Sequence, residues 1–182
     1  MANTVNPHQY LQEAQLIHSQ QAVNQAISTM AEQLNQCYVN EPPIVLCVMG
    51  GAVYFTGQLL PKLQFPLEFD FVQATRYQDS TEGKELKWIV MPKASVKDRN
   101  LLILDDILDE GITLKAIVDQ CKLLGAKEIK SAVLVEKQLN KNKAMNADYV
   151  GLIVPERYVF GCGMDVYGWW RNLPAIYALK AT

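Results

Sequence analysis

Hydrophobic residues recur at helical spacing near the start of the chain. Between residues 7 and about 37 they share the chain with Gln and Asn in the pattern of an amphipathic helix, for which we allow one break. Two prolines, Pro42 and Pro43, end this segment. The aliphatic run Ile44–Met49 then predicts a buried strand that leads into two glycines.

The middle of the chain alternates between strand-like and helix-like segments. Polar residues without a period, 78–87, interrupt it and predict a loop. The expected order is a helix at 53–63, a strand at 67–74, that loop, a short strand near 87–91, a strand at 101–104, a helix at 114–124 and a strand at 129–135. This alternation predicts an α/β fold, with a central parallel sheet flanked by helices on both faces.

The last 35 residues follow a different pattern. Short extended pieces at 149–154, 158–160 and 175–179 are separated by Pro155, a Gly-Cys-Gly cluster and Pro174. We expect them to form a small lid-like subdomain over the ligand edge of the sheet. A length of 182 residues with 49% hydrophobic content suits one domain, residues 1–182.

Composition excludes several classes of function. A net charge of -2 leaves no broad basic face for nucleic acid, and no apolar run approaches the roughly 20 residues that span a membrane. The four cysteines include no CxxC pair, and the only histidines are His8 and His18, so a zinc site is not expected. These features indicate a soluble cytoplasmic protein with reduced thiols.

The segment LLILDDILDEGITL, residues 101–114, places acids within an aliphatic run. Asp105 and Asp106 fall at the carboxyl end of the predicted strand, where open α/β sheets bind ligands. Two adjacent carboxylates repel each other unless a cation or hydrogen-bond donors neutralise them. A metal or sugar hydroxyls would serve, and a plain structural turn is the alternative.

The turn after this pair has the features of a phosphate site. Gly111 permits a positive φ, Thr113 offers a hydroxyl, and a helix begins here with its backbone N–H groups exposed. Asp109 in the same turn would face whatever is attached to that phosphate. A ribose 5-phosphate fits the acidic pair, the turn and Asp109 together.

These residues resemble the phosphoribosyl pyrophosphate (PRPP) signature of type I phosphoribosyltransferases, and within them the hypoxanthine-guanine phosphoribosyltransferases. The segments VMGG at 48–51, VLVEK at 133–137 and DYVGLIVPERYVFGCGMDVYGWWR at 148–171 extend the resemblance. It implies transfer of ribose 5-phosphate from PRPP to N9 of hypoxanthine or guanine, with Mg²⁺. It also implies a hood built from the N-terminal segment and residues 138–182, and a homodimer or homotetramer.

The resemblance implies roles on the PRPP side. Asp105 and Asp106 would lie beside the ribose hydroxyls and, with Asp165, near Mg²⁺. The 5-phosphate would be held by Glu110, Gly111, Ile112, Thr113 and Leu114, and the pyrophosphate by Met49, Gly50, Gly51, Arg76, Tyr77 and Arg171. The loop 78–87 would close over the pyrophosphate.

The resemblance also implies roles on the base side. Asp109 would exchange a proton with N7 of the purine, and Lys137 would donate to O6, which excludes adenine. Tyr158 would stack on the base and Val159 would contact it through the main chain, near Asp165. Taken alone, Lys137 reads as an ordinary strand-end lysine and Tyr158 as a core aromatic.

Three positions depart from the family pattern. Met49 stands where many relatives have Lys, Arg76 replaces a usual Ser, and Glu110 replaces a usual Thr. We expect Arg76 to restore the charge missing at Met49, and the side chain of Glu110 to point away from the phosphate.

Two other classes share part of this pattern. A receiver domain also has an acidic pair at a strand end, but its later phosphoacceptor Asp ends a strand, whereas Asp148 precedes one. A regulator that senses PRPP without catalysis would keep the turn and need a basic face. It could lack Asp109, Lys137 or Arg171, which are all present, and it is the alternative function.

Overall fold

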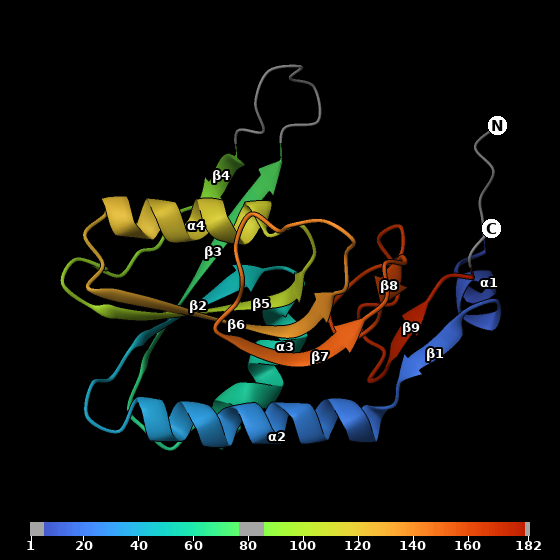
Figure 1. Cartoon of the computed structure of the whole chain (residues 1–182), viewed down its shortest axis with the longest axis horizontal. Helices are drawn as coiled ribbons and strands as arrows, with labels where there is room; N and C mark the ends of the chain where they lie inside the picture. Colours follow the sequence, from blue (N-terminus) through green and yellow to red (C-terminus); the bar gives the residue numbers. More distant parts are fainter. Residues whose placement is uncertain (1–5, 77–85, 181–182) are drawn as a thin grey trace.

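The protein is built on one six-stranded sheet, seen in a computed structural model that describes residues 6–76 and 86–180 (Figure 1). The strand order is β4-β3-β2-β5-β6-β7. In chain order these strands are β2 (Ile44–Met49), β3 (Glu68–Arg76), β4 (Leu86–Val90), β5 (Asn100–Leu108), β6 (Glu128–Lys137) and β7 (Tyr149–Val154). All neighbours are parallel except β3 and β4. The predicted α/β fold is therefore confirmed, with one antiparallel edge strand.

Helices cover both faces of the sheet, as predicted. On one face α2 (Gln20–Cys37) and α3 (Ala52–Leu59) pack with alternate side chains of the strands, such as Leu102, Leu104 and Leu134. On the other face α4 (Ile112–Leu123) packs on Leu101, Ile103 and Val133. Figure 1 shows α4 on the side of the sheet opposite α2. Burial of β5 on both faces explains its unbroken aliphatic run.

The N-terminal segment is not one helix. It contains α1 (Pro7–Gln12), strand β1 (Gln15–His18) and then α2, which begins after Ser19. The Ser19 hydroxyl accepts a hydrogen bond from the backbone N–H of Ala22 at 3.3 Å and so caps the new helix. The break that we allowed is thus a strand, which the helical spacing did not reveal.

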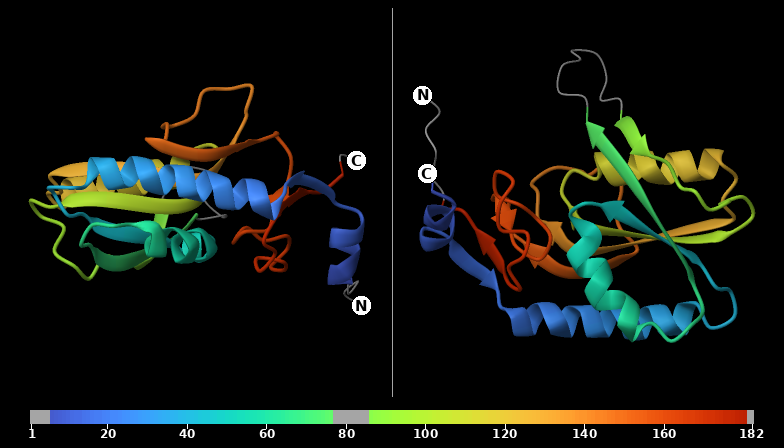
Figure 2. Two further views of the ribbon diagram at one scale, coloured as in Figure 1. Left: turned by 90° about the horizontal axis from the view of Figure 1, so that it is seen from below. Right: turned by 180° about the vertical axis from the view of Figure 1, so that it is seen from behind.

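A second, three-stranded sheet forms a hood at one end of the molecule (Figure 2). Its order is β1-β9-β8, where β8 is Val159–Phe160 and β9 is Ile176–Ala178, and both pairings are antiparallel. The N-terminal segment and the end of the chain therefore share one small sheet.

Several element boundaries differ from those predicted. The helix expected at 53–63 ends at Leu59 and continues as a 3₁₀ turn, Leu60–Lys62, that contains Pro61. Strand β5 extends to Leu108, so Asp105 and Asp106 lie inside its carboxyl-terminal part. Leu86 and Lys87 belong to β4, and the rest of the predicted loop lies outside the described residues.

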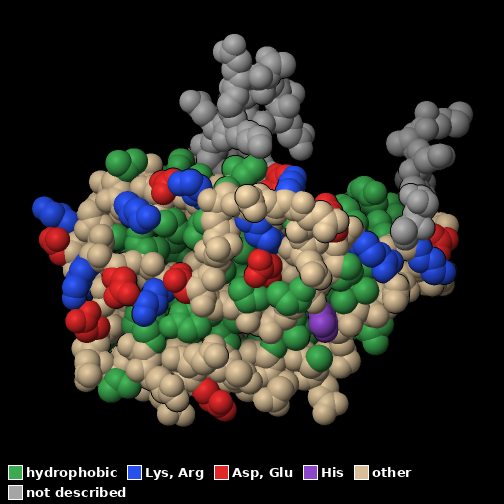
Figure 3. Space-filling view, in the orientation of Figure 1, with side chains coloured by type: hydrophobic (Ala, Val, Ile, Leu, Met, Phe, Trp, Pro, Cys, Tyr) green, Lys and Arg blue, Asp and Glu red, His purple; other side chains and the backbone are tan. Residues whose placement is uncertain are grey.

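The described part of the chain has no helix that is both long and apolar enough to span a membrane. On the face shown in Figure 3, acidic and basic side chains are interspersed and no continuous basic area is seen.

Candidate active site

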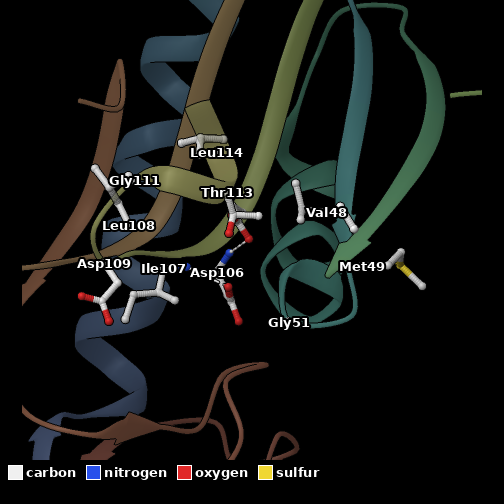
Figure 4. A pocket seen from close by; sticks show the side chains of 12 residues that line it. Val48, Met49, Gly51, Asp106, Ile107, Leu108, Asp109, Gly111, Thr113 and Leu114 are labelled. Carbon is white, nitrogen blue, oxygen red and sulfur yellow. Dashed lines mark hydrogen bonds between the residues drawn. The ribbon is translucent and has the colours of Figure 1, made fainter. Parts of the chain in front are cut away.

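A pocket of about 240 Å³ opens at the carboxyl ends of β2 and β5 and the start of α4 (Figure 4). Its lining combines the predicted acidic pair with the turn before α4. The lining residues are Val48, Met49, Gly51, Ala74, Asp105, Asp106, Ile107, Leu108, Asp109, Gly111, Thr113 and Leu114. The structure thus brings much of the predicted PRPP site together.

The two adjacent acids of this pocket lie side by side, with Asp105 buried and Asp106 half-buried. The Asp105 carboxylate accepts a hydrogen bond from the backbone N–H of Asp106, and the Asp106 carboxylate accepts one from Ile107, each at 2.9 Å. Burial, helped by the charge of Asp106, raises the pKa of Asp105 well above its ordinary value. Burial also raises the pKa of Asp106, although hydrogen bonds and the charge of Arg171 oppose this. The pair therefore favours ligands that bring a cation or hydroxyl donors.

The loop after β2 approaches these acids closely. A Cβ atom added at Gly51 would lie 1.7 Å from Oδ2 of Asp106, so any larger residue would force that carboxylate to move. A Cβ atom at Gly50, which follows a cis peptide bond from Met49, would meet nothing within 4 Å. Figure 4 shows the Met49 side chain directed away from Asp106. A contact within the protein, with Asp106, therefore favours glycine at position 51.

The turn before α4 has the predicted conformation. Gly111 has a φ of 77°, and α4 begins at the next residue. Lys115 donates its backbone N–H to the Gly111 carbonyl at 2.9 Å, which closes the first turn of the helix. The Glu110 side chain forms an ion pair with Lys141 from the loop after β6. This ion pair links the turn before α4 to the loop after β6, a role for Glu110 that the sequence did not reveal.

A second pocket, of about 210 Å³, adjoins the first. Asp106, Ile107 and Asp109 line both pockets. The remaining lining residues are Lys137, Tyr158, Val159, Met164 and Asp165. Every residue predicted to bind the base lies here, so one continuous site joins the two halves.

Ion pairs occupy this second pocket. Nζ of Lys137 lies 2.5 Å from Oδ2 of Asp109, and the lysine side chain is only 15% exposed. Nη2 of Arg171 lies 2.5 Å from Oδ1 of Asp165, while its Nη1 donates to the carbonyl of Gly163 at 2.7 Å. A Cβ atom at Gly163 would lie 1.9 Å from the Gly51 carbonyl oxygen, so the hood touches the loop after β2. These contacts hold Arg171 close to the predicted pyrophosphate loop.

Tyr158 has an exposed ring at the hood side of the second pocket. It is 45% exposed and stacks on Tyr167, with ring centroids 5.6 Å apart at an angle of 21°. Tyr167 in turn lies 5.2 Å from the ring of Tyr10. A half-exposed ring that stacks on another ring through one face leaves its other face for a flat ligand. Tyr158 is therefore not the core aromatic that the sequence alone suggested.

The acids fit a magnesium ion that is bound together with a substrate. Among residues 6–76 and 86–180, no three His, Cys, Asp or Glu side chains gather into a metal site. The predicted metal ligands Asp105, Asp106 and Asp165 therefore do not form one closed set. Mg²⁺ is commonly held by one or two carboxylates together with substrate phosphates, and a single acid from this site meets that need.

Comparison with known proteins identifies the family. A model of the phosphoribosyl transferase domain matches residues 13–167. The chain belongs to this family. This chain is 37% identical over 163 residues to the bifunctional protein TilS/HprT of Listeria innocua, a match that covers 89% of the chain. The chain spans only 25% of that relative's length.

Two further relatives match this chain over nearly their full length. The hypoxanthine-guanine phosphoribosyltransferase of Bacillus subtilis (strain 168) is 33% identical over 163 residues, 89% of this chain and 91% of that protein. A crystal structure of a hypoxanthine phosphoribosyltransferase from Staphylococcus aureus superposes with a TM-score of 0.87 at 27% identity. It covers 99% of this chain and 97% of its own. The family and the type I phosphoribosyltransferase fold that the sequence predicted are confirmed.

Two residues predicted on the pyrophosphate side come at the end of β3 and directly after it in the sequence. Arg76 is the last residue of β3, and Tyr77 lies outside the described residues. Among the residues that sequence reasoning missed, Ile107 lines both pockets and Met164 lines the second. Ile107 could have been found from its place between Asp106 and Asp109. Lys143, described below, carried no such signal.

Proposed function

We propose that this phosphoribosyltransferase transfers ribose 5-phosphate from PRPP to N9 of hypoxanthine or guanine, giving the nucleotide and pyrophosphate. The observation that carries this proposal is the Lys137–Asp109 pair at the junction of the two pockets. It places a hydrogen-bond donor and a proton acceptor side by side, as O6 and N7 are side by side on one edge of a 6-oxopurine. The names of the Bacillus and Staphylococcus relatives support the same assignment.

In the proposed reaction, the purine enters the second pocket between the ring of Tyr158 and the end of β5. Lys137 turns from Asp109 to O6, and Asp109 faces N7. N9 attacks the anomeric carbon as the bond to pyrophosphate breaks, the electron pair leaves with pyrophosphate, and the proton on N7 passes to Asp109. An amino group at C6 would present a second donor to the Lys137 ammonium, so adenine is disfavoured.

The first pocket is proposed to hold the rest of PRPP. Asp105 and Asp106 accept hydrogen bonds from the ribose hydroxyls, which neutralise two carboxylates that burial has left poorly solvated. Backbone N–H groups of the turn from Glu110 to Leu114 bind the 5-phosphate at the start of α4. Gly51 and Arg171 lie on the pyrophosphate side.

Magnesium dependence is part of the proposal. When bound, Mg²⁺ would neutralise charge on the pyrophosphate and so favour its departure. Asp165 is the proposed protein ligand, because it lines the pocket and carries one carboxylate oxygen paired with Arg171 and the other with the backbone N–H of Gly168 at 2.8 Å. Asp105 and Asp106 would act near the ion through the ribose.

A self-associating surface is also proposed. Hydrophobic side chains of α3 and β3 surround a separate hollow lined by Cys47, Met49, Val53, Thr56, Gly57, Leu60, Phe69 and Phe71. Val53 is 49% and Phe69 51% exposed, so part of this hydrophobic lining is open to solvent and available for contact. We propose that it forms the contact of a homodimer or homotetramer, to be checked by light scattering of the wild type and of Phe69→Glu. The four free cysteines support a cytoplasmic location.

The function is tested by incubating the protein with PRPP, Mg²⁺ and one of hypoxanthine, guanine, xanthine or adenine, and measuring nucleotide and pyrophosphate. We expect product with hypoxanthine or guanine, little with adenine, and none when Mg²⁺ is removed with a chelator. PRPP binding without product from any 6-oxopurine would favour the regulator alternative, for which the comparisons give no support.

A further inference from the structure

Lys143 is a nearly buried lysine in the loop between β6 and β7. Its side chain is 9% exposed. Its Nζ atom donates hydrogen bonds to three backbone carbonyls: Lys137 at 2.5 Å, Asp109 at 2.8 Å and Leu108 at 3.0 Å. Oε1 of Glu136 lies 3.5 Å away. All three protons of one ammonium group thus have acceptors within the protein.

The three carbonyls belong to the ends of two neighbouring strands. Leu108 is the last residue of β5 and Lys137 the last of β6. The parallel pairing of these strands ends at Leu108 and Glu136. Lys143 therefore connects β5 and β6 just beyond the last residue pair of their parallel pairing.

Two of the joined residues carry the proposed base chemistry. Asp109 and Lys137 have their own side chains 2.5 Å apart in the second pocket. Their backbone carbonyls both accept hydrogen bonds from the Lys143 ammonium group. A charged group is costly to bury, and this one is compensated by hydrogen bonds to three main-chain carbonyls.

We infer that Lys143 is a positioning residue, which fixes the spacing between Asp109 and Lys137 so that they meet N7 and O6 of the same purine ring. The inference rests on the proposed roles of those two residues. Lys143 lines neither pocket and is not proposed to touch the substrate.

The phosphate turn has separate anchors in the same loop. The backbone N–H of Ala144 donates to the Glu110 carbonyl at 2.9 Å, and Lys141 pairs with the Glu110 side chain. In Figure 1 the loop after β6 rises beside the start of α4 before it returns to β7. Because these contacts do not use the Lys143 ammonium, its removal should disturb the base side of the site more than the PRPP side.

The test compares Lys143→Met, which keeps the length of the side chain but has no donors, with Lys143→Arg, which keeps charge and several donors. For Lys143→Met we expect kcat/KM for hypoxanthine to fall at least about tenfold, within the roughly 100-fold range that small misplacements of reacting groups produce. The dissociation constant of PRPP should change less than about threefold, a small effect on the affinity scale. Lys143→Arg should recover part of the loss.

Lys127→Met is the matched control, because Lys127 forms an exposed ion pair with Glu41 away from both pockets. It should leave both constants unchanged. Thermal unfolding of every variant separates loss of fold from loss of positioning, since a merely stabilising lysine would lower Tm without changing the ratio of the two constants.

Unchanged hypoxanthine kinetics in Lys143→Met, or equal losses for hypoxanthine and PRPP, would overturn the inference. If that variant does not fold, Lys143→Gln replaces it. A shorter neutral donor should show the same selective loss, and a folded Lys143→Gln with wild-type kinetics would likewise refute the role. Wild-type protein that turns over no 6-oxopurine would instead reject the proposed function, so the two failures are distinguishable.

Discussion

The two adjoining pockets handle negative charge in opposite ways. In the first, Asp105 and Asp106 make no ion pair within the described part of the chain, and burial raises the pKa of both. In the second, Asp109 is paired with Lys137 and Asp165 with Arg171. Asp105 and Asp106 therefore have no paired cation, whereas Asp109 and Asp165 are each neutralised by a cation of the protein.

This difference has consequences for binding. A ligand that brings hydroxyl donors or a cation stabilises the desolvated carboxylates of the first pocket, which favours its binding there. A ligand of the second pocket must separate existing ion pairs and replace their hydrogen bonds. A molecule that offers an acceptor to Lys137 and a proton to Asp109 replaces the hydrogen bonds of this pair and leaves neither charge without a partner. This requirement selects against ligands that lack either group.

The largest expected effect comes from Asp109→Asn. The amide has nearly the same shape but cannot take a proton, so turnover should fall by about 10² to 10⁴, the usual contribution of a general base. PRPP binding, measured by calorimetry, should remain within a few-fold of wild type because the first pocket keeps Asp105 and Asp106. Equal losses in turnover and PRPP affinity would argue against the acid–base role.

Lys137→Met should have the next largest effect and removes the cation from the base pocket. A hydrogen bond with a charged partner contributes about 1.5 to 3 kcal/mol, so kcat/KM for hypoxanthine should fall about 10- to 100-fold. The preference for hypoxanthine over adenine should narrow at the same time. Steady-state rates with both bases measure this, with Lys127→Met as the control. A preserved preference would show that O6 is recognised elsewhere.

Asp105→Asn should lower PRPP affinity but raise stability. Because the pKa of Asp105 is raised in the folded state, the wild type loses stability as pH rises from the ordinary value of 3.8 to the raised folded value. The Asn oxygen can still accept from the backbone N–H of Asp106, as the Asp105 carboxylate does at 2.9 Å. We expect Tm at neutral pH to increase by a few degrees, since about 1 kcal/mol shifts Tm by roughly 2 to 4 °C at this chain length.

The pH dependence of that gain supplies the check. As pH falls through the raised pKa, wild-type Asp105 becomes protonated and loses its destabilising charge, so the two unfolding curves should converge in acid. A variant that is less stable than wild type at neutral pH, or a difference that does not vary with pH, would contradict the description of the first pocket.

Glu110→Gln should have the smallest effect. Its partner Lys141 has a side chain that is 58% exposed, and exposed ion pairs contribute about 0 to 1 kcal/mol. Turnover and PRPP affinity should stay within about twofold of wild type, which is about 0.4 kcal/mol on the same scale. A large loss of PRPP affinity would mean that the Glu110 side chain acts in the phosphate turn, contrary to its direction in the structure.

The sequence predicted those features that depend on local chemistry. The acids near the end of β5, the positive φ of Gly111 and a helix after that glycine follow from one short segment, although the helix begins at Ile112 and not at Leu114 as predicted. Alternating strands and helices were also enough to predict the main sheet.

Features that depend on distant residues were not predictable. Strand β1 lies where helical spacing was expected, and it is a strand because it pairs with β9, far away in the chain. The partner of Glu110 and the three carbonyls held by Lys143 were equally hidden, since a lysine in a polar loop looks the same whether it is solvated or buried. The need for glycine at Gly51 comes from Asp106 on another strand.

The order of strands in the hood has a consequence for synthesis on the ribosome. β9 lies between β1 and β8, so β1 has no partner until Ile176–Ala178 has been made. The residues of the main sheet are all translated earlier, and local pairing there can begin first. A nascent chain thus carries its acidic pocket before it has a finished hood, and a truncation just before β9 would leave β1 as an unpaired edge open to association with other chains.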